Sequence, residues 1–90
     1  MRIAMIGTGG VAARHLGVLR DVPGLELVGH LSADGARADV QARQWGGRGY
    51  SRLDYLLDSE RPHAVWVCVT PDGHGPLEEM LIERGVHFFV

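Results

Sequence analysis

Short apolar runs alternate along the chain with segments whose apolar residues recur every three or four positions. Residues 3–6 and 64–69 are continuous apolar runs, which are typical of strands buried on both faces of a sheet. Residues 25–31 are expected to form another strand, 48–50 a weaker one and 86–90 the last. The pattern therefore predicts strands spread evenly along the whole chain.

Segments with helical spacing lie between these strands, and turn residues bound them. The predicted helices cover 10–21, 37–45, a short stretch opened by Ser51, and 76–84. The sequence Ser51-x-x-Asp54 has the form of a capping box, which predicts Ser51 as the cap of the short helix. Pro76 in the first turn and Gly85 after the last are typical of the two ends of a helix.

Strands that alternate with helices predict an α/β fold, with a parallel sheet covered by helices on both faces. Because crossovers between parallel strands are right-handed, the sheet is expected to be doubly wound in the Rossmann manner, with strand order 3-2-1-4-5. Residues 1–90 are expected to be part of one domain, whose sheet is incomplete at its C-terminal edge.

A glycine-rich turn joins the first strand to the first helix. Its residues are Gly7, Thr8, Gly9, Gly10, Val11 and Ala12. In this strand–turn–helix context the first glycine permits a tight turn, the second lets a pyrophosphate approach the backbone, and a small third residue lets helix and strand pack closely. The helix N-terminus then attracts phosphate. The motif predicts dinucleotide binding, and the alternative is a turn that only joins two elements.

The residues after the second strand are expected to select the dinucleotide. An acidic residue there would bind the ribose 2′-OH of NAD, but the chain has Ser32 and Ala33. Asp34 is expected to cap the next helix instead. Arg37 could reach a 2′-phosphate from the first turn of that helix, although it could equally belong to a solvated helix face. The cofactor is therefore expected to be NAD or NADP, and the pattern favours NADP.

The turn after the fourth strand contributes further candidates. Ligands of open α/β sheets bind beyond the carboxyl ends of the strands, so this turn should face the glycine loop. Thr70 and Pro71 are expected to contact the cofactor. His74 could contact the cofactor or act in proton transfer, and the alternative is a polar residue at a helix N-terminus. No histidine spacing typical of a metal site occurs, so no metal is expected.

Composition excludes several classes of function. The chain carries nine arginines and no lysine against 11 acidic residues, with a net charge of −2. Nucleic acid or an anionic membrane is therefore not expected as a partner, and a Schiff base or Walker lysine is impossible within this chain. Cys68 is the single cysteine, and no apolar run is long enough for a signal peptide or a membrane span. A cytoplasmic location is expected.

Several segments together resemble the glucose-fructose oxidoreductase/inositol dehydrogenase/rhizopine-catabolism (Gfo/Idh/MocA) family. They are the opening run 2–16, Tyr50 followed by Leu56-Leu57, the Thr-Pro-Asp-Gly-His turn at 70–74, and the Gly-Val-His strand within 83–90. The resemblance covers the whole chain. The chain departs from the family pattern at Ala12, which replaces a glycine, and at Ser32, where an acid is frequent.

The resemblance implies a two-domain NAD(P)-dependent oxidoreductase, a homo-oligomer in its full-length form, which acts on sugars, cyclitols or similar small hydroxy compounds. The resemblance implies that the family's catalytic lysine lies in a Glu-Lys-Pro tripeptide that would follow Val90. No catalytic residue is therefore assigned here. The substrate-binding domain is expected to be absent from these residues, and the 90 residues alone are expected to be inactive. The alternatives are a non-catalytic nucleotide-binding or regulatory module, and an interaction domain without a ligand.

Overall fold

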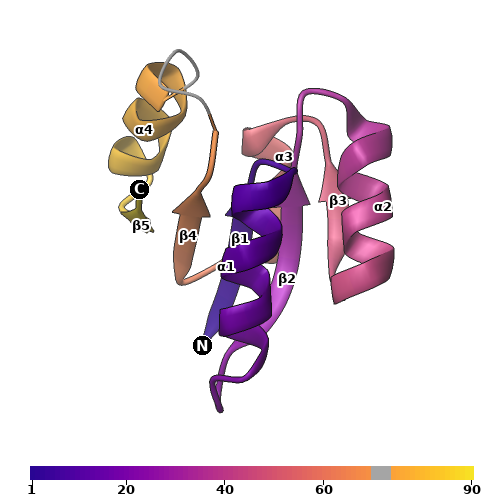
Figure 1. Ribbon diagram of the computed structural model, residues 1–90. Helices are drawn as coiled ribbons and strands as arrows, with labels where there is room; N and C mark the ends of the chain where they lie inside the picture. Colours follow the sequence, from indigo (N-terminus) through magenta and orange to yellow (C-terminus); the bar gives the residue numbers. More distant parts are fainter. Residues whose placement is uncertain (70–73) are drawn as a thin grey trace.

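The computed structural model describes residues 1–69 and 74–90. Its strands and helices alternate strictly along the described chain (Figure 1). In chain order they are β1 (Arg2–Ile6), α1 (Gly10–Arg20), β2 (Glu26–Leu31), α2 (Gly35–Trp45), β3 (Arg48–Tyr50), α3 (Leu53–Glu60), β4 (Ala64–Val67), α4 (His74–Glu83) and β5 (His87–Phe89).

The strands form one parallel sheet in the order β3-β2-β1-β4-β5, which confirms the predicted α/β fold and strand order. β1 lies at the centre and pairs with both β2 and β4. The chain winds outward from β1 in one direction through β2 and β3, and then in the other through β4 and β5. The carboxyl ends of β1 and β4 therefore meet where the winding direction changes.

The alternation of side chains along the central strand builds a core on each face of the sheet. Ala4 and Ile6 point to the face covered by α3 and α4, where the buried leucines include Leu56 and Leu81. Met5 points to the opposite face and packs against α1 through Ala12 and Leu16. In Figure 1, α1 lies in front of the sheet and α3 behind it. Because residues 3–6 of β1 are buried between the helices on the two faces, they had to be apolar.

Local contacts shift several of the predicted boundaries. α2 begins at Gly35, two residues earlier than predicted, because the Asp34 carboxylate accepts a hydrogen bond from the Ala36 N–H at 2.9 Å. The prediction that Ser51 caps α3 is wrong, since the capping position belongs to Arg52. The Asp54 carboxylate instead binds the Arg52 guanidinium at 2.7 Å, so it cannot complete a capping box.

The end of the sheet formed by β4 and β5 carries an aromatic pair. β4 ends at Val67, earlier than the predicted 69, and β5 forms the edge of the sheet in the described chain. The rings of Trp66 and Phe89, which are register partners, lie 4.6 Å apart between centroids. Among the described residues, no helix is both long and apolar enough to cross a lipid bilayer.

Candidate functional site

The glycine turn lies at the carboxyl end of the central strand, held by backbone contacts to its neighbours. The Gly7 N–H donates a hydrogen bond of 2.7 Å to the Leu31 carbonyl at the end of β2, and Gly7 is buried. Gly9 is exposed and is the last residue before α1. The turn is therefore anchored at its first glycine and open to solvent at its second.

Two of the glycines are required by backbone conformation. Gly7 has φ 110° and Gly9 has φ 124°, which are angles that residues with a side chain rarely adopt. At Gly7 a Cβ would also overlap the backbone of Cys68, which follows β4. At Gly9 a Cβ would meet only open space, so the bare backbone there faces the outside of the loop.

The N-terminus of α1 presents backbone donors without a side-chain cap. The capping residue is Gly9, which has no side chain to bond to the first turn, and that turn contains no acidic residue. The first N–H groups of a helix have no partner within the helix, and the helix dipole adds positive potential there. Ala12 in this turn is buried against Met5, which places α1 close to the sheet. The arrangement can bind a phosphate group.

Two hollows open on either side of this turn. One, of about 460 Å³, lies between α1 and α2, with Thr8, Gly9, Arg37 and Gln41 in its lining. The other, of about 450 Å³, lies between α1 and the end of β4, and its lining includes Thr8 and Cys68. Thr8 lines both, so a ligand that crosses the turn could occupy the two hollows together.

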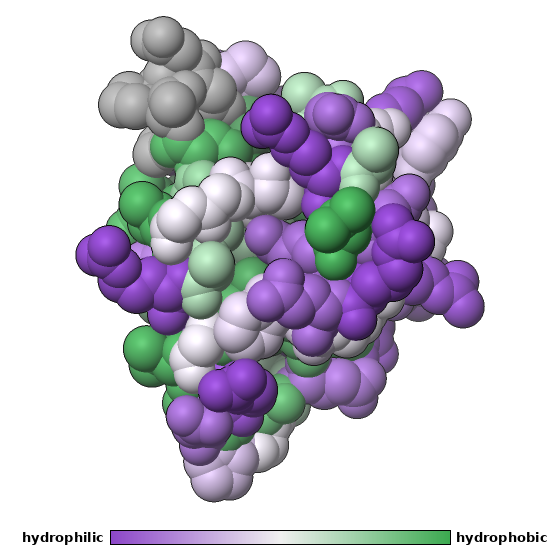
Figure 2. All heavy atoms as spheres, turned by 45° about the vertical axis from the view of Figure 1, so that its right-hand side comes forward, coloured by the Kyte–Doolittle hydropathy of each residue, from purple (hydrophilic) through white to green (hydrophobic). Residues whose placement is uncertain are grey.

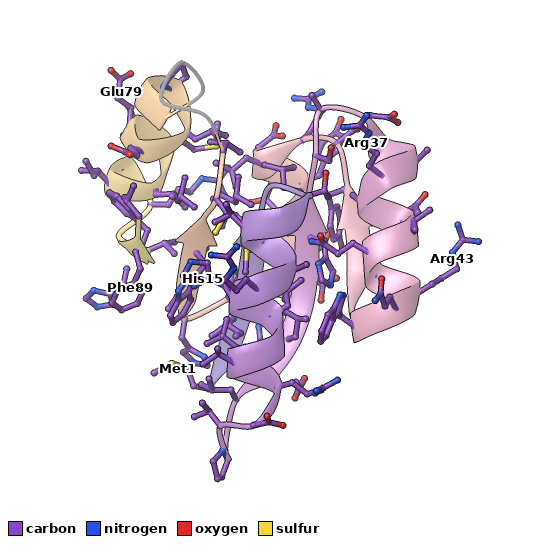
Figure 3. The ribbon with its side chains drawn as sticks, in the orientation of Figure 1. Met1, His15, Arg37, Arg43, Glu79 and Phe89 are labelled. Atoms are coloured by element: carbon purple, nitrogen blue, oxygen red, sulfur yellow. The ribbon has the colours of Figure 1, made fainter. Side chains whose placement is uncertain are left out.

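The predicted selectivity residues lie at the α2 side of the site. Arg37 is exposed at the start of α2, at the same end of the sheet as the glycine turn (Figure 3). Asp34 caps α2, as expected. Ser32 is half-buried and donates its N–H to the Tyr50 carbonyl at 3.1 Å, and Ala33 is exposed. Of these residues only Arg37 lines the α1–α2 hollow.

The remaining candidates lie on the β4 side. Thr70 and Pro71 lie outside the described residues, and His74 is the first residue of α4. Cys68 is half-buried, and burial raises the pKa of its thiol. Among the residues that the structure describes, no three His, Cys, Asp or Glu side chains come together as metal ligands.

Apart from Arg37, sequence reasoning missed the α2 side chains that line the first hollow. Gln41 is buried and donates a hydrogen bond of 3.2 Å to the Gly7 carbonyl, and Val40 and Trp45 also contribute to the lining. A signal was present, because Gln41 lies on the same helical stripe as the buried Ala38 and Ala42. The surface around α2 is mostly hydrophilic, with isolated apolar side chains (Figure 2).

Comparisons with known proteins agree with this geometry. A family model described as an oxidoreductase family with an NAD-binding Rossmann fold matches residues 1–90. A D-apiose dehydrogenase from Paraburkholderia graminis is 31% identical over 84 residues, which are 92% of this chain and 22% of that protein.

Two solved structures are similar along nearly the whole chain. The WlbA dehydrogenase from Chromobacterium violaceum, in complex with NADH and UDP-GlcNAcA, is 25% identical with a TM-score of 0.88, over 98% of this chain and 26% of that one. A variant of a 3-ketoreductase from Actinomadura kijaniata, in complex with NADP and TDP-benzene, is 25% identical with a TM-score of 0.87. The match covers 98% of this chain and 28% of that one. The chain thus spans about a quarter of the length of these relatives.

Proposed function

Because the chain belongs to the Gfo/Idh/MocA oxidoreductase family, with its NAD-binding Rossmann fold, we propose that it is the part of an NAD(P)-dependent enzyme that holds the dinucleotide. The enzyme would transfer a hydride between the nicotinamide and a sugar, cyclitol or similar small hydroxy compound. The observation that carries this proposal is the uncapped N-terminus of α1 behind Gly7 and Gly9, flanked by two hollows.

The shape of the site supports one direction for the dinucleotide. The pyrophosphate would bind over Gly9 and the first N–H groups of α1, where the backbone is open and the dipole is favourable. The adenosine half would extend into the α1–α2 hollow, beyond β2. The nicotinamide half would extend toward the end of β4, where Thr70, Pro71 and His74 are proposed to contact it. Ligands bind in this way at the point where a doubly wound sheet reverses.

The charges near α2 support NADP. Asp34, the first acidic residue after the carboxyl end of β2, already accepts the Ala36 N–H, so its carboxylate is engaged in capping. Arg37 lines the hollow that would hold the adenosine ribose and can supply positive charge for a 2′-phosphate. Ser32 can donate a hydrogen bond without repelling that phosphate. The relatives bind NADH in one case and NADP in another.

We propose that the chemistry itself uses groups outside these 90 residues. The chain has no lysine, whereas the resemblance implies a catalytic lysine just beyond the last strand. Substrate contacts would likewise come from a second domain, in keeping with relatives about four times as long. We expect the 90 residues alone to bind dinucleotide weakly and to catalyse no substrate-dependent turnover.

Calorimetric and thermal titration with NADPH and NADH tests this function. Millimolar NADPH should raise the melting temperature of the chain, because a ligand that binds only the folded state stabilises it by mass action. Binding without turnover, even in a longer protein that contains the lysine, would favour a regulatory module. No shift with either cofactor would favour an interaction domain.

A further inference from the structure

A largely buried series of hydrogen bonds joins the glycine turn, through α2 and β2, to the C-terminal end of α2. The Gln41 side-chain nitrogen Nε2 lies 3.2 Å from the Gly7 carbonyl oxygen and 2.9 Å from Nδ1 of His30. The other ring nitrogen of His30, Nε2, lies 2.7 Å from the carbonyl oxygen of Gly46, the residue that ends α2. His30 is fully buried and Gln41 is 7% exposed.

Only one arrangement of protons satisfies the donors and acceptors in this series of hydrogen bonds. The Gly7 and Gly46 carbonyls only accept, so Gln41 must present its amide nitrogen to Gly7, and Nε2 of His30 must carry a proton. The two amide hydrogens then serve Gly7 and Nδ1 of His30. Rotating the amide by half a turn would place its oxygen against the Gly7 carbonyl, and both would be acceptors. His30 is therefore neutral, with its proton on Nε2.

We propose that Gln41 and His30 are positioning residues that hold the glycine turn in the shape that receives the dinucleotide pyrophosphate. The inference rests on the proposed function and extends it to residues outside the glycine motif. Gln41 lines the α1–α2 hollow beside Thr8 and Gly9, so it contacts the site and the buried histidine at once. Through His30 the same series of hydrogen bonds reaches the carbonyl of Gly46, the residue that ends α2 against the sheet.

Protonation of His30 would break this arrangement. A second proton on Nδ1 would face the amide nitrogen of Gln41, so two donors would oppose each other. The ionisable side chains on the elements that surround its face of the sheet lie at the surface or are half-buried. They are Arg2 of β1, Arg14, His15 and Arg20 of α1, Arg37, Asp39 and Arg43 of α2, and Arg48 and Tyr50 of β3.

Burial lowers the pKa of His30, and the Gly46 carbonyl offsets only part of that effect. The neutral form is thus favoured near pH 7, when the hydrogen-bond chain is intact. The protonation state of the buried His30 ring is therefore coupled, through Gln41, to the Gly7 carbonyl of the glycine turn.

The first experiment compares two leucine substitutions on α2. Gln41→Leu removes both donors while nearly keeping the side-chain volume, and it should weaken NADPH binding to the chain at least fivefold. Arg43→Leu is the matched control, because Arg43 is exposed on the same helix and points away from the glycine turn (Figure 3). Its affinity should stay within twofold of the unsubstituted chain. A folded Gln41→Leu chain with unchanged affinity would overturn the inference.

The second experiment does not require Gln41→Leu to fold. Nitrogen NMR of the imidazole should show His30 as the Nε2–H tautomer at pH 7.5, with or without cofactor. The pH is then lowered stepwise until the NMR signals show that His30 is protonated. Over that range NADPH binding should weaken more in the unsubstituted chain than in His30→Gln, which keeps a donor and an acceptor but cannot titrate. Protonation of the cofactor's own phosphate affects both chains equally, so it cannot account for a difference between them.

Each outcome of this second experiment has a definite meaning. An Nδ1–H tautomer, or the same dependence of NADPH affinity on pH in the two chains, would refute the positioning role while leaving dinucleotide binding intact. If the unsubstituted chain binds neither NADPH nor NADH, the proposed function fails and the inference fails with it.

Discussion

The backbone carbonyl of Cys68 occupies the space that a side chain on Gly7 would need. A Cβ built there would overlap the carbonyl oxygen and lie 2.8 Å from the carbonyl carbon. The turn after β1 and the segment after β4 are thus in direct contact, at the point where the winding of the sheet reverses. The first glycine of the loop is required by tertiary packing as well as by its positive φ.

Gly7→Ala should therefore destabilise the fold. Left-handed strain and the backbone overlap together should cost about 2 kcal/mol or more of the free energy of unfolding, measured by urea denaturation. Gly10→Ala is the control for stability, since its Cβ would meet open space and its φ is not positive. That change should fall within about 1 kcal/mol of the unsubstituted chain. Equal destabilisation by both would contradict the role assigned to Cys68.

Asp34→Ala should lower stability without changing cofactor preference. Losing the acceptor for the Ala36 N–H should cost about 1 kcal/mol, whereas Asp34→Ser keeps an oxygen at the cap and should cost less. Urea denaturation gives the stabilities, and parallel titrations give the ratio of NADPH to NADH affinity. A selective loss of NADH binding in Asp34→Ala would show that the carboxylate serves the ribose.

Two substitutions should move cofactor preference toward NADH. Ser32→Asp places a negative charge where it repels a 2′-phosphate, and Arg37→Gln removes a positive charge from the lining of the hollow. Each should shift the ratio of NADPH to NADH affinity by about tenfold, or about 1.4 kcal/mol. The ratio is measured by fluorescence titration. A Ser32→Asp chain that still prefers NADPH would refute the placement of Ser32.

Cys68 provides a chemical probe of the nicotinamide side. Because burial raises its pKa and the thiolate is the reactive form, alkylation at pH 8 should be much slower in the folded chain than in urea. NADPH should slow it further, since Cys68 lines the hollow proposed for the nicotinamide half. As the single cysteine, it allows mass spectrometry to read the rate directly. Unchanged labelling at saturating NADPH would place that half of the cofactor elsewhere.

Stability should fall in mild acid because of His30. Its pKa in the folded chain is below the 6.5 of an unperturbed histidine, so the unfolded chain binds the proton more readily. The stability that the neutral ring contributes is fully present above pH 6.5. It is lost as the pH falls from 6.5 through the lowered pKa of the folded chain, and His30 causes no further loss below that pKa. Urea denaturation of the His30→Gln chain should lack this step. An identical acid loss in both chains would assign it to other groups.

The order of the elements and the central glycine motif follow from the sequence alone. Apolar runs such as residues 3–6 must lie in a sheet covered on both faces, and the alternation with helices leaves few topologies once crossovers are right-handed. Helix ends were less predictable. Asp34 caps α2 through a contact only two residues away, yet Ser51 is displaced as a cap by an ion pair between Arg52 and Asp54.

Only the tertiary structure decided which distant residues support the glycine turn. Gln41 is separated from Gly7 by 34 residues, and nothing in the local pattern around either shows that they are bonded. The close approach of Gly7 to the Cys68 backbone likewise depends on two strands meeting at the centre of the sheet. Hydrophobic periodicity reports the environment of a segment, whereas a hydrogen bond or a steric conflict depends on the positions of individual atoms in two segments. Packing brings those atoms together.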